Sequence, residues 1–263
     1  MKQGDHEAIT EVERATWNRS AATYLEHAAE LTKHAIPWLL DACALTKDSH
    51  AIDVACGPGH LTNLMSKSGA HVVGVDLSSA MIERAKRLYP GLTFYEAHVE
   101  ALPFENDIFD LALINFAIHH FARPEIACAE IRRVIKRGGR LIFAGPLKQF
   151  GFGAFIEGIT AHHTLDDLPH GPIYLDADCG TYEKLMQDSG FKECDVQAQQ
   201  LTLHLDTLDP LLVAGWDICE LGTLPDDTQE KIRSTTTEKA QPYRIKSGYE
   251  FPDTIVTGVA IKR

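Results

Sequence analysis

The spacing of apolar and polar residues changes character near residue 50. Residues 7–47 place apolar side chains such as Trp17, Ala21 and Tyr24 at helical intervals, which predicts an N-terminal helical cap. From residue 51, short apolar runs alternate with amphipathic stretches, which predicts strands at 51–55, 71–76, 92–98, 109–116 and 140–145 and helices at 61–68, 79–88 and 124–136. Strands separated by helices indicate a parallel sheet with right-handed crossovers, as in an α/β, Rossmann-like fold.

The pattern is looser after residue 145. It predicts a helix at 150–164, a loop at 165–179, a helix at 182–189 and a long strand at 192–205. Two helices follow within residues 206–243, and the β-branched run 254–261 predicts a last strand. Two strands with helices inserted between them therefore end the chain and bring the predicted sheet to seven strands.

Three residue types mark helix ends in this pattern. Ser78 is placed to cap the helix at 79–88, and Pro124 is placed in the first turn of the helix at 124–136. Gly138 and Gly139 are expected to end that second helix and to turn the chain into the fifth strand, and Arg132 and Arg133 near its end are interpreted as a solvated helix face.

Composition narrows the possible partners. The chain has 263 residues, is 44% hydrophobic and carries a formal net charge of −12, which opposes binding to nucleic acid because such binding uses clustered Lys and Arg. We therefore expect a small, uncharged or cationic substrate. Residues 1–13 lack the apolar run of a signal peptide, and no later run approaches the roughly 20 apolar residues of a membrane span, which predicts a cytoplasmic protein. The six cysteines form no Cys-x-x-Cys pair, so neither a zinc site nor a disulfide framework is expected.

A glycine-rich turn after the first strand is the strongest sign of a ligand site. A phosphate-binding loop needs a Lys after the second glycine, and none follows Gly59; a dinucleotide fingerprint needs a small residue where Thr62 stands. The second strand ends at Asp76, roughly 20 residues beyond Gly57, where a carboxylate can accept both hydroxyls of an adenosine ribose. The turn and this acid predict one site for an adenosine-bearing ligand.

Five sequence blocks between residues 51 and 145 extend this site. They are Ile52–Gly59, Gly74–Ser78 with Met81, Glu100–Phe104 followed by Phe109 and Asp110, Asn115–His120, and Glu130–Gly139. In their order and spacing they resemble the class I S-adenosylmethionine-dependent methyltransferases of the small-molecule type, represented by ubiquinone/menaquinone-biosynthesis and malonyl-carrier-protein methyltransferases. The resemblance implies S-adenosylmethionine as the cofactor and an antiparallel strand at the edge of the sheet.

The resemblance also implies roles for individual residues. Asp53 and the backbone from Ala55 through Cys56 and Gly57 to Gly59 would meet the methionine end of the cofactor, and Asp76 the ribose. Leu77 and Met81 would flank the adenine, Asn115 and Phe116 would lie beside the sulfonium, and Tyr24, with Trp17, would close over the cofactor.

One residue departs from the family pattern. Many relatives carry an acid that accepts a hydrogen bond from the adenine amino group, whereas this chain has His98. A neutral imidazole nitrogen could accept that bond, helped by the amide of Val99.

Candidates for the chemistry beyond cofactor binding are few. His119 and His120 follow the fourth strand, and either could remove a proton from the acceptor; alternatively, the pair orients the cofactor loop or packs beneath a helix. Trp216 and Glu220 are spaced to face one pocket from the inserted helix, and His162 belongs to a His- and Asp-rich stretch that fits a lid loop better than a metal site.

These elements predict three regions. Residues 1–47 form the cap, residues 48–205 and 244–263 form the Rossmann-like domain, and residues 206–243 form a substrate lid to which 147–179 contribute. The expected function is transfer of a methyl group to an O, N or C atom of a small-molecule or carrier-bound acceptor. The alternatives are a cyclisation or decarboxylation that uses the same cofactor, and a non-catalytic regulatory protein that binds it. The acceptor and the oligomeric state are left open by the sequence.

Overall fold

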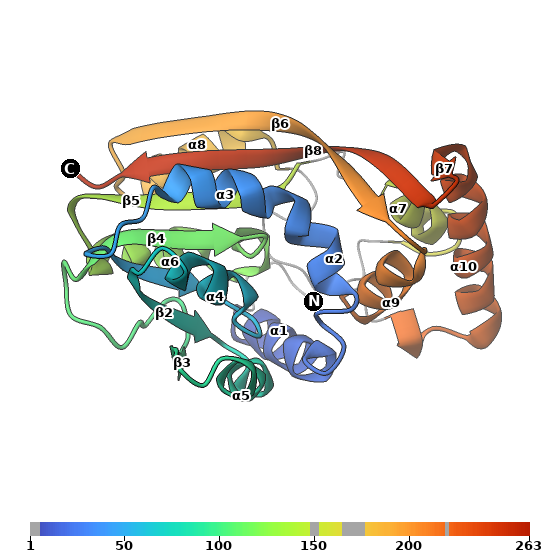
Figure 1. Cartoon of the computed structure of the whole chain (residues 1–263). Coiled ribbons are helices and arrows are strands. Elements are labelled where there is room, and N and C mark those ends of the chain that lie inside the picture. Colours follow the sequence, from blue (N-terminus) through green and yellow to red (C-terminus); the bar gives the residue numbers. More distant parts are fainter. Residues whose placement is uncertain (1–5, 148–152, 165–176, 219–220) are drawn as a thin grey trace.

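The structure is a computed structural model that describes residues 6–147, 153–164, 177–218 and 221–263. Its centre is one sheet in the order β3-β2-β1-β4-β5-β8-β6, with the short β7 paired to β8 (Figure 1). The strands are β1 (His50–Val54), β2 (His71–Asp76), β3 (Thr93–Glu96), β4 (Phe109–Asn115), β5 (Ile135–Pro146), β6 (Glu193–Leu205), β7 (Arg244–Ile245) and β8 (Gly248–Ile261). The mostly parallel, Rossmann-like sheet predicted from the sequence is confirmed.

One strand on the main path of the sheet is reversed. β8 runs antiparallel to both β5 and β6, whereas the pairs from β3 to β5 are parallel. The antiparallel strand therefore lies one place in from the edge. The central strands read as continuous apolar runs because helices cover both of their faces, and Leu111 to Ile114 of β4 are fully buried.

Helices cover the two faces of the sheet. α3 and α4 pack on one face, and α6 and α8 pack on the other (Figure 1). Ser78 caps α5, as predicted, by accepting a hydrogen bond from the amide of Met81, and Pro124 lies in the first turn of α6. The helices are α1 (His6–Ser20), α2 (Ala28–Thr32), α3 (Ile36–Cys43), α4 (His60–Ser66), α5 (Ser79–Leu88), α6 (Pro124–Val134), α7 (Gly153–Thr160), α8 (Cys179–Asp188), α9 (Asp209–Ile218) and α10 (Asp226–Ala240). Among the described residues, no helix has both the length and the apolar character needed to cross a bilayer.

Gly138 and Gly139 lie inside β5 and do not end a helix. α6 ends at Val134 and β5 begins at the next residue, and the register of β5 against β4 shifts at this point. Gly138 has a φ of 80° and its amide donates to the carbonyl of Lys262. The expected helix terminator was wrong, because pairing with the C-terminal segment draws the chain directly from helix into strand.

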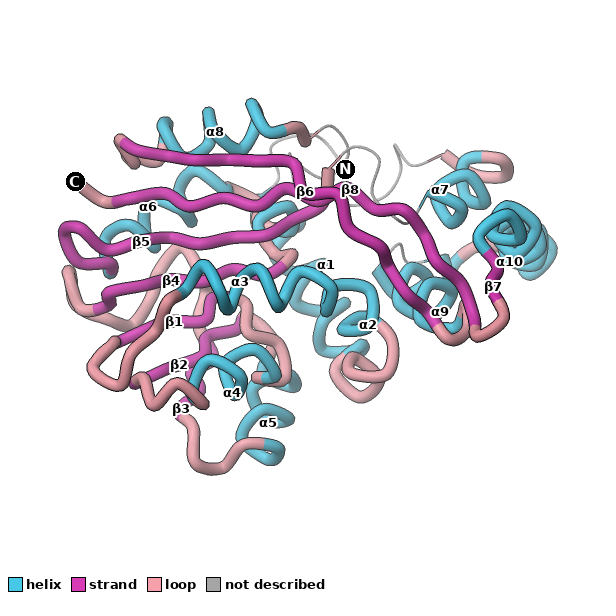
Figure 2. The backbone as a smooth tube through the Cα atoms, turned by 45° about the horizontal axis from the view of Figure 1, so that its top comes forward, coloured by secondary structure: helices cyan, strands magenta, loops and turns pink. Residues whose placement is uncertain are grey.

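A second apolar core forms where β6 and β8 extend beyond the rest of the sheet. Figure 2 shows the two strands running together toward α7, α9 and α10. Phe155 of α7 and Leu211 of α9 are buried in this core with Ile232 of α10. α9 and α10 occupy the predicted insertion at 206–243, while most of the predicted loop at 165–179 lies outside the described residues.

Candidate functional site

Two adjoining cavities lie where β1, β2 and β4 end. Their volumes are about 100 and 220 Å³, and they share Tyr24, Ala55 and Asn115 in their walls. Together they reach the lower end of the roughly 300–1,000 Å³ that small-ligand sites occupy. The first cavity is also lined by Gly57, Asp76, Leu77, Met81, His98, Val99, Phe116 and His120, and the second by Asp53, Cys56, Pro58 and His60. The structure thus brings together twelve of the thirteen cofactor residues expected from the sequence.

The carboxylate of Asp53, near the end of β1, accepts a hydrogen bond from α4, the helix that follows. Thr62 Oγ1 donates a 2.6 Å hydrogen bond to Asp53 Oδ2, and Asp53 is only 2% exposed. Burial raises the pKa of Asp53 to about 7. Thr62, which argues against a dinucleotide fingerprint in the sequence, therefore has a positive role here that the sequence analysis missed.

The glycine turn and the second acid form one hydrogen-bonded unit. Asp76 accepts from the amide of Gly57 through one carboxylate oxygen and from the amide of Ser78 through the other, each at 2.8 Å. Burial raises the pKa of Asp76 to about 6. One carboxylate thus connects the turn after β1 to the first turn of α5. The glycine turn and Asp76 lie together, as the sequence predicted.

Gly59 is the expected cofactor residue that lines neither cavity. It precedes α4 with a φ of 80°, and a Cβ built there would lie 2.6 Å from Cζ of Phe94. Its place in the motif is therefore explained by backbone conformation and by close packing against β3. Gly57, by contrast, lies beside the ring of Tyr24 in the cavity wall.

His98 lines the first cavity beside Val99 as a hydrogen-bond donor. Its Nδ1 accepts from the amide of Glu100 at 3.2 Å, and burial lowers the pKa of His98, which favours the neutral ring. In the neutral ring the hydrogen is then on Nε2. This tautomer does not fit the expected acceptance of a hydrogen bond from an adenine amino group through Nε2.

The end of β4 contributes a strained backbone and an unsatisfied oxygen. Phe116 has a φ of 53°, and Ala55 at the end of the adjacent β1 has a φ of 56°, values that non-glycine residues rarely adopt. Asn115 Oδ1 is buried and has no hydrogen-bond partner. A buried acceptor without a partner is costly, so this oxygen marks a position that a ligand donor can complete.

The N-terminal helix closes the first cavity. Thr10, Glu13 and Trp17 of α1 line it. Asn18 Oδ1 accepts from Ser78 Oγ at 2.7 Å and from a backbone amide of α5, while Arg14 donates to the carbonyl of Leu77. The sequence predicted Trp17 at this cavity but not the polar residues of the same helix, because their partners lie about sixty residues away.

The two adjacent histidines have different environments. His119 is buried, and burial lowers its pKa well below the usual value. His120 lines the first cavity, and its Nδ1 lies 3.1 Å from Oε1 of Glu13. Only His120 of the pair is therefore placed at the wall of the cavity.

Comparison with known proteins identifies the family. Residues 52–143 match the family model described as a methyltransferase domain. A malonyl-[acyl-carrier protein] O-methyltransferase of Salmonella typhimurium is 30% identical over 175 residues, covering 66% of each chain. A ubiquinone/menaquinone biosynthesis C-methyltransferase of Campylobacter jejuni is 31% identical over 183 residues, covering 64% of this chain and 77% of that protein. The chain belongs to the class I S-adenosylmethionine-dependent methyltransferases. It spans about a third to three quarters of the length of the curated relatives it matches.

A solved structure supports the fold of this methyltransferase family member. The YcgJ protein of Bacillus subtilis superposes with a TM-score of 0.63 at 19% identity, covering 88% of this chain and 99% of that one. At this identity the likeness concerns the fold alone.

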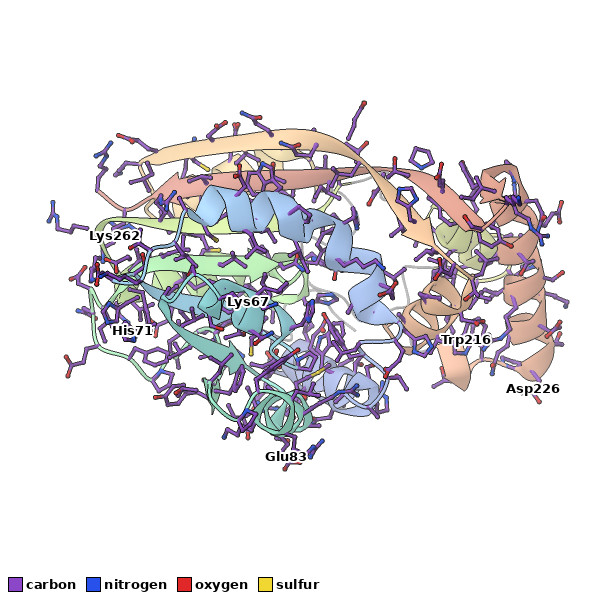
Figure 3. All side chains as sticks on the ribbon, in the orientation of Figure 1. Lys67, His71, Glu83, Trp216, Asp226 and Lys262 are labelled. Carbon is purple, nitrogen blue, oxygen red and sulfur yellow. The ribbon has the colours of Figure 1, made fainter. Side chains whose placement is uncertain are left out.

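The two described residues expected to contact the substrate, Trp216 and His162, line neither cavity. Trp216 lies among α9 and α10 (Figure 3), where the guanidinium carbon of Arg233 is 3.9 Å from the centre of its ring. His162 is exposed after α7 and its Nε2 lies 2.8 Å from the hydroxyl of Thr235. Glu220 lies outside the described residues.

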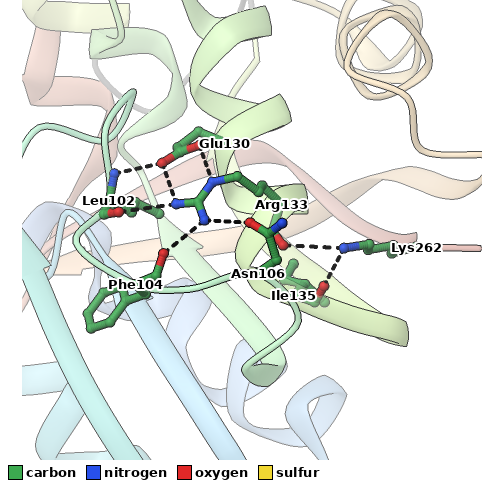
Figure 4. Close-up of polar contacts among 7 residues, drawn as sticks. All are labelled: Leu102, Phe104, Asn106, Glu130, Arg133, Ile135 and Lys262. Carbon is green, nitrogen blue, oxygen red and sulfur yellow. Dashed lines mark hydrogen bonds and ion pairs between the residues drawn. The ribbon is translucent and has the colours of Figure 1, made fainter.

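The loop that follows β3 is fixed by an arginine from α6. Arg133 donates to the carbonyls of Leu102 and Phe104 and to Asn106 Oδ1, and it pairs with Glu130 (Figure 4). The interpretation of Arg133 as part of a solvated helix face was therefore wrong. Its hydrogen bonds hold the loop that begins beside His98 in the cavity wall.

Proposed function

We propose that this protein transfers the methyl group of S-adenosylmethionine to an O, N or C atom of a small-molecule or carrier-bound acceptor. The observation that carries the proposal is Asp76, whose two oxygens join the glycine turn to α5 while the residue lines the cavity. The names of the curated relatives favour methyl transfer over cyclisation, decarboxylation or a purely regulatory role.

The residues in the cavity walls fit this cofactor. Asp76 would accept the ribose hydroxyls, and Leu77, Met81 and Val99 would flank the adenine. His98 would donate from Nε2 to a ring nitrogen of the adenine, in keeping with its tautomer.

The methionine end would lie between β1 and β4. The unsatisfied Asn115 Oδ1 would accept from the methionine amino group, beside the backbone of Ala55, Cys56 and Gly57. The cationic cofactor would offset the charge of Asp53, for which burial disfavours ionisation. When bound, the cofactor supplies an already activated methyl group, so the protein has mainly to orient the acceptor and receive any proton that it loses.

Isothermal titration with S-adenosylmethionine tests this proposal. Asp76→Ala removes the acceptor of two charged hydrogen bonds worth about 1.5–3 kcal/mol each, so the dissociation constant should rise by at least about 100-fold. Asp227→Ala removes an equal charge from the exposed face of α10 and should leave binding unchanged. Absence of binding by the wild type, or equal binding by both variants, would refute the cofactor site.

A further inference from the structure

Glu13 of α1 reaches across the first cavity to the segment that follows β4. Its Oε1 lies 3.1 Å from Nδ1 of His120, and its Oε2 accepts from the indole N–H of Trp17 at 2.9 Å. The side chains of Glu13 and His120 are only 12% and 11% exposed. The two residues are 107 positions apart in the sequence, and they pair in the wall of the cavity.

This contact sets the tautomer of the imidazole. A carboxylate only accepts hydrogen bonds, so Nδ1 of His120 must be the donor, and in the neutral ring Nε2 then carries the lone pair. The ring of Trp17 stands edge-on to that of His120 at 5.1 Å, and the ring of His119 lies 4.0 Å away. Trp17 and His119 therefore hold the plane of the imidazole, and Glu13 fixes the position of its hydrogen.

The charged groups around His120 limit the acceptor. Glu13 on α1 and His119 on η2 (Ile118–His120) contact the ring, and Asp76, His98 and Glu100 line the same cavity. Among the described residues of this lining there is no Lys or Arg. A carboxylate acceptor would meet these acidic neighbours with only the cationic cofactor to offset its charge, and it would already be ionised near neutral pH and have no proton to lose.

On the basis of the proposed function, we propose that Glu13 is a positioning residue that holds His120 as the proton acceptor, and that the methyl acceptor bears a weakly acidic hydroxyl, as a phenol does. In the transfer, a lone pair or ring electron pair of the acceptor forms the bond to the methyl carbon. The carbon–sulfur bond breaks with its electron pair remaining on sulfur, and the proton lost by the acceptor passes to Nε2 of His120. Glu13 stabilises the resulting imidazolium until the proton leaves to solvent.

The tautomer can be read directly in the complex with S-adenosylhomocysteine. Long-range proton–nitrogen NMR correlations, assigned with His120→Gln, should show the hydrogen of His120 on Nδ1. Glu13→Leu should remove that preference, Glu13→Gln should retain part of it, and Glu7→Leu, the same change at an exposed position of α1, should leave it intact. A hydrogen on Nε2 in the wild type, or a tautomer unaffected by Glu13→Leu, overturns the proposal.

Turnover separates the two acceptor classes. With 1,4-naphthohydroquinone, which carries phenolic hydroxyls, Glu13→Leu should lower kcat about 100-fold or more and leave the KM for S-adenosylmethionine unchanged. Glu13→Gln should move the acidic limb of the pH–rate profile to lower pH, because a neutral amide stabilises an imidazolium less than a carboxylate does. Methylation of a malonyl thioester by Glu13→Leu at the wild-type rate would overturn the proposal. Failure of the wild type to bind S-adenosylhomocysteine would instead count against the proposed function.

Discussion

Replacing Gly59 with Ala should lower the free energy of unfolding, because of the backbone conformation of this residue and its close packing against Phe94. The residue has a φ of 80°, where an L side chain costs roughly 1–2 kcal/mol. The added Cβ would also lie 2.6 and 2.7 Å from two ring atoms of Phe94 and 3.2 Å from Cβ of Ala85. Phe94 is 4% exposed and Ala85 is fully buried, so neither neighbour has room to move, and overpacking of this kind costs about 1–3 kcal/mol. The expected loss is therefore about 2–5 kcal/mol.

Gly138 provides a matched control for this substitution. It also has a φ of 80°, but a Cβ built there would meet no atom within 4 Å. Gly138→Ala should therefore show only the backbone cost of about 1–2 kcal/mol. Urea denaturation of both variants, followed by circular dichroism, measures the difference in unfolding free energy, and a Gly59→Ala variant no less stable than Gly138→Ala would refute the packing argument.

Cofactor affinity gives the same variant a second readout. Gly59 lines neither cavity, so Gly59→Ala should bind S-adenosylmethionine with nearly wild-type affinity under conditions where it remains folded. Titration at low temperature, where the variant is folded, measures this affinity. A large loss of affinity without a loss of stability would show that Gly59 approaches the cofactor directly.

Three further results are expected. Burial raises the pKa of Asp53 to about 7 and that of Asp76 to about 6, so the folded cofactor-free protein binds protons more tightly than the unfolded chain. Its stability should therefore fall by about 4–6 kcal/mol as pH rises from about 4 to 7, and Asp53→Asn should flatten this dependence in urea titrations at several pH values. Asn18→Ala should weaken S-adenosylmethionine binding about 5- to 150-fold in calorimetry, because α1 loses two hydrogen bonds to α5 worth about 0.5–1.5 kcal/mol each. His34→Ala should lower the melting temperature, since it removes the 2.7 Å hydrogen bond to the buried carboxylate of Asp253, worth about 1.5–3 kcal/mol; an unchanged melting curve would contradict this.

Much of the fold and of the cofactor site could be predicted from the sequence because the signals are local. Ser78 caps α5 three residues before its partner Met81, and the apolar run of β4 lies within seven residues. Asp76 could be placed beside the glycine turn because parallel strands joined by one crossover bring their carboxyl ends to the same edge.

The predictions that failed depended on contacts between distant segments. Gly138 resembles a helix terminator in the sequence, and its role in β5 depends on Lys262 at the other end of the chain. Arg133 resembles a surface residue of α6 until the loop from Leu102 to Asn106 is placed against it. Both partners lie outside the segment of the residue that they contact, so residue spacing within that segment does not reveal the contact.

The N-terminal helix shows why cofactor binding and acceptor chemistry should be coupled. Asn18 fixes α1 to the first turn of α5, whose cap Ser78 also donates its amide to Asp76. Five residues earlier on the same helix, Glu13 holds His120. The hydrogen bonds that seat α1 over the ribose acid therefore also bring a carboxylate to the histidine, so a chain with α1 displaced would lack both the cover of the cofactor cavity and the oriented imidazole. Residues on α1 that touch no ligand should consequently affect both binding and turnover, whereas Glu13, which contacts His120 directly, should affect turnover alone.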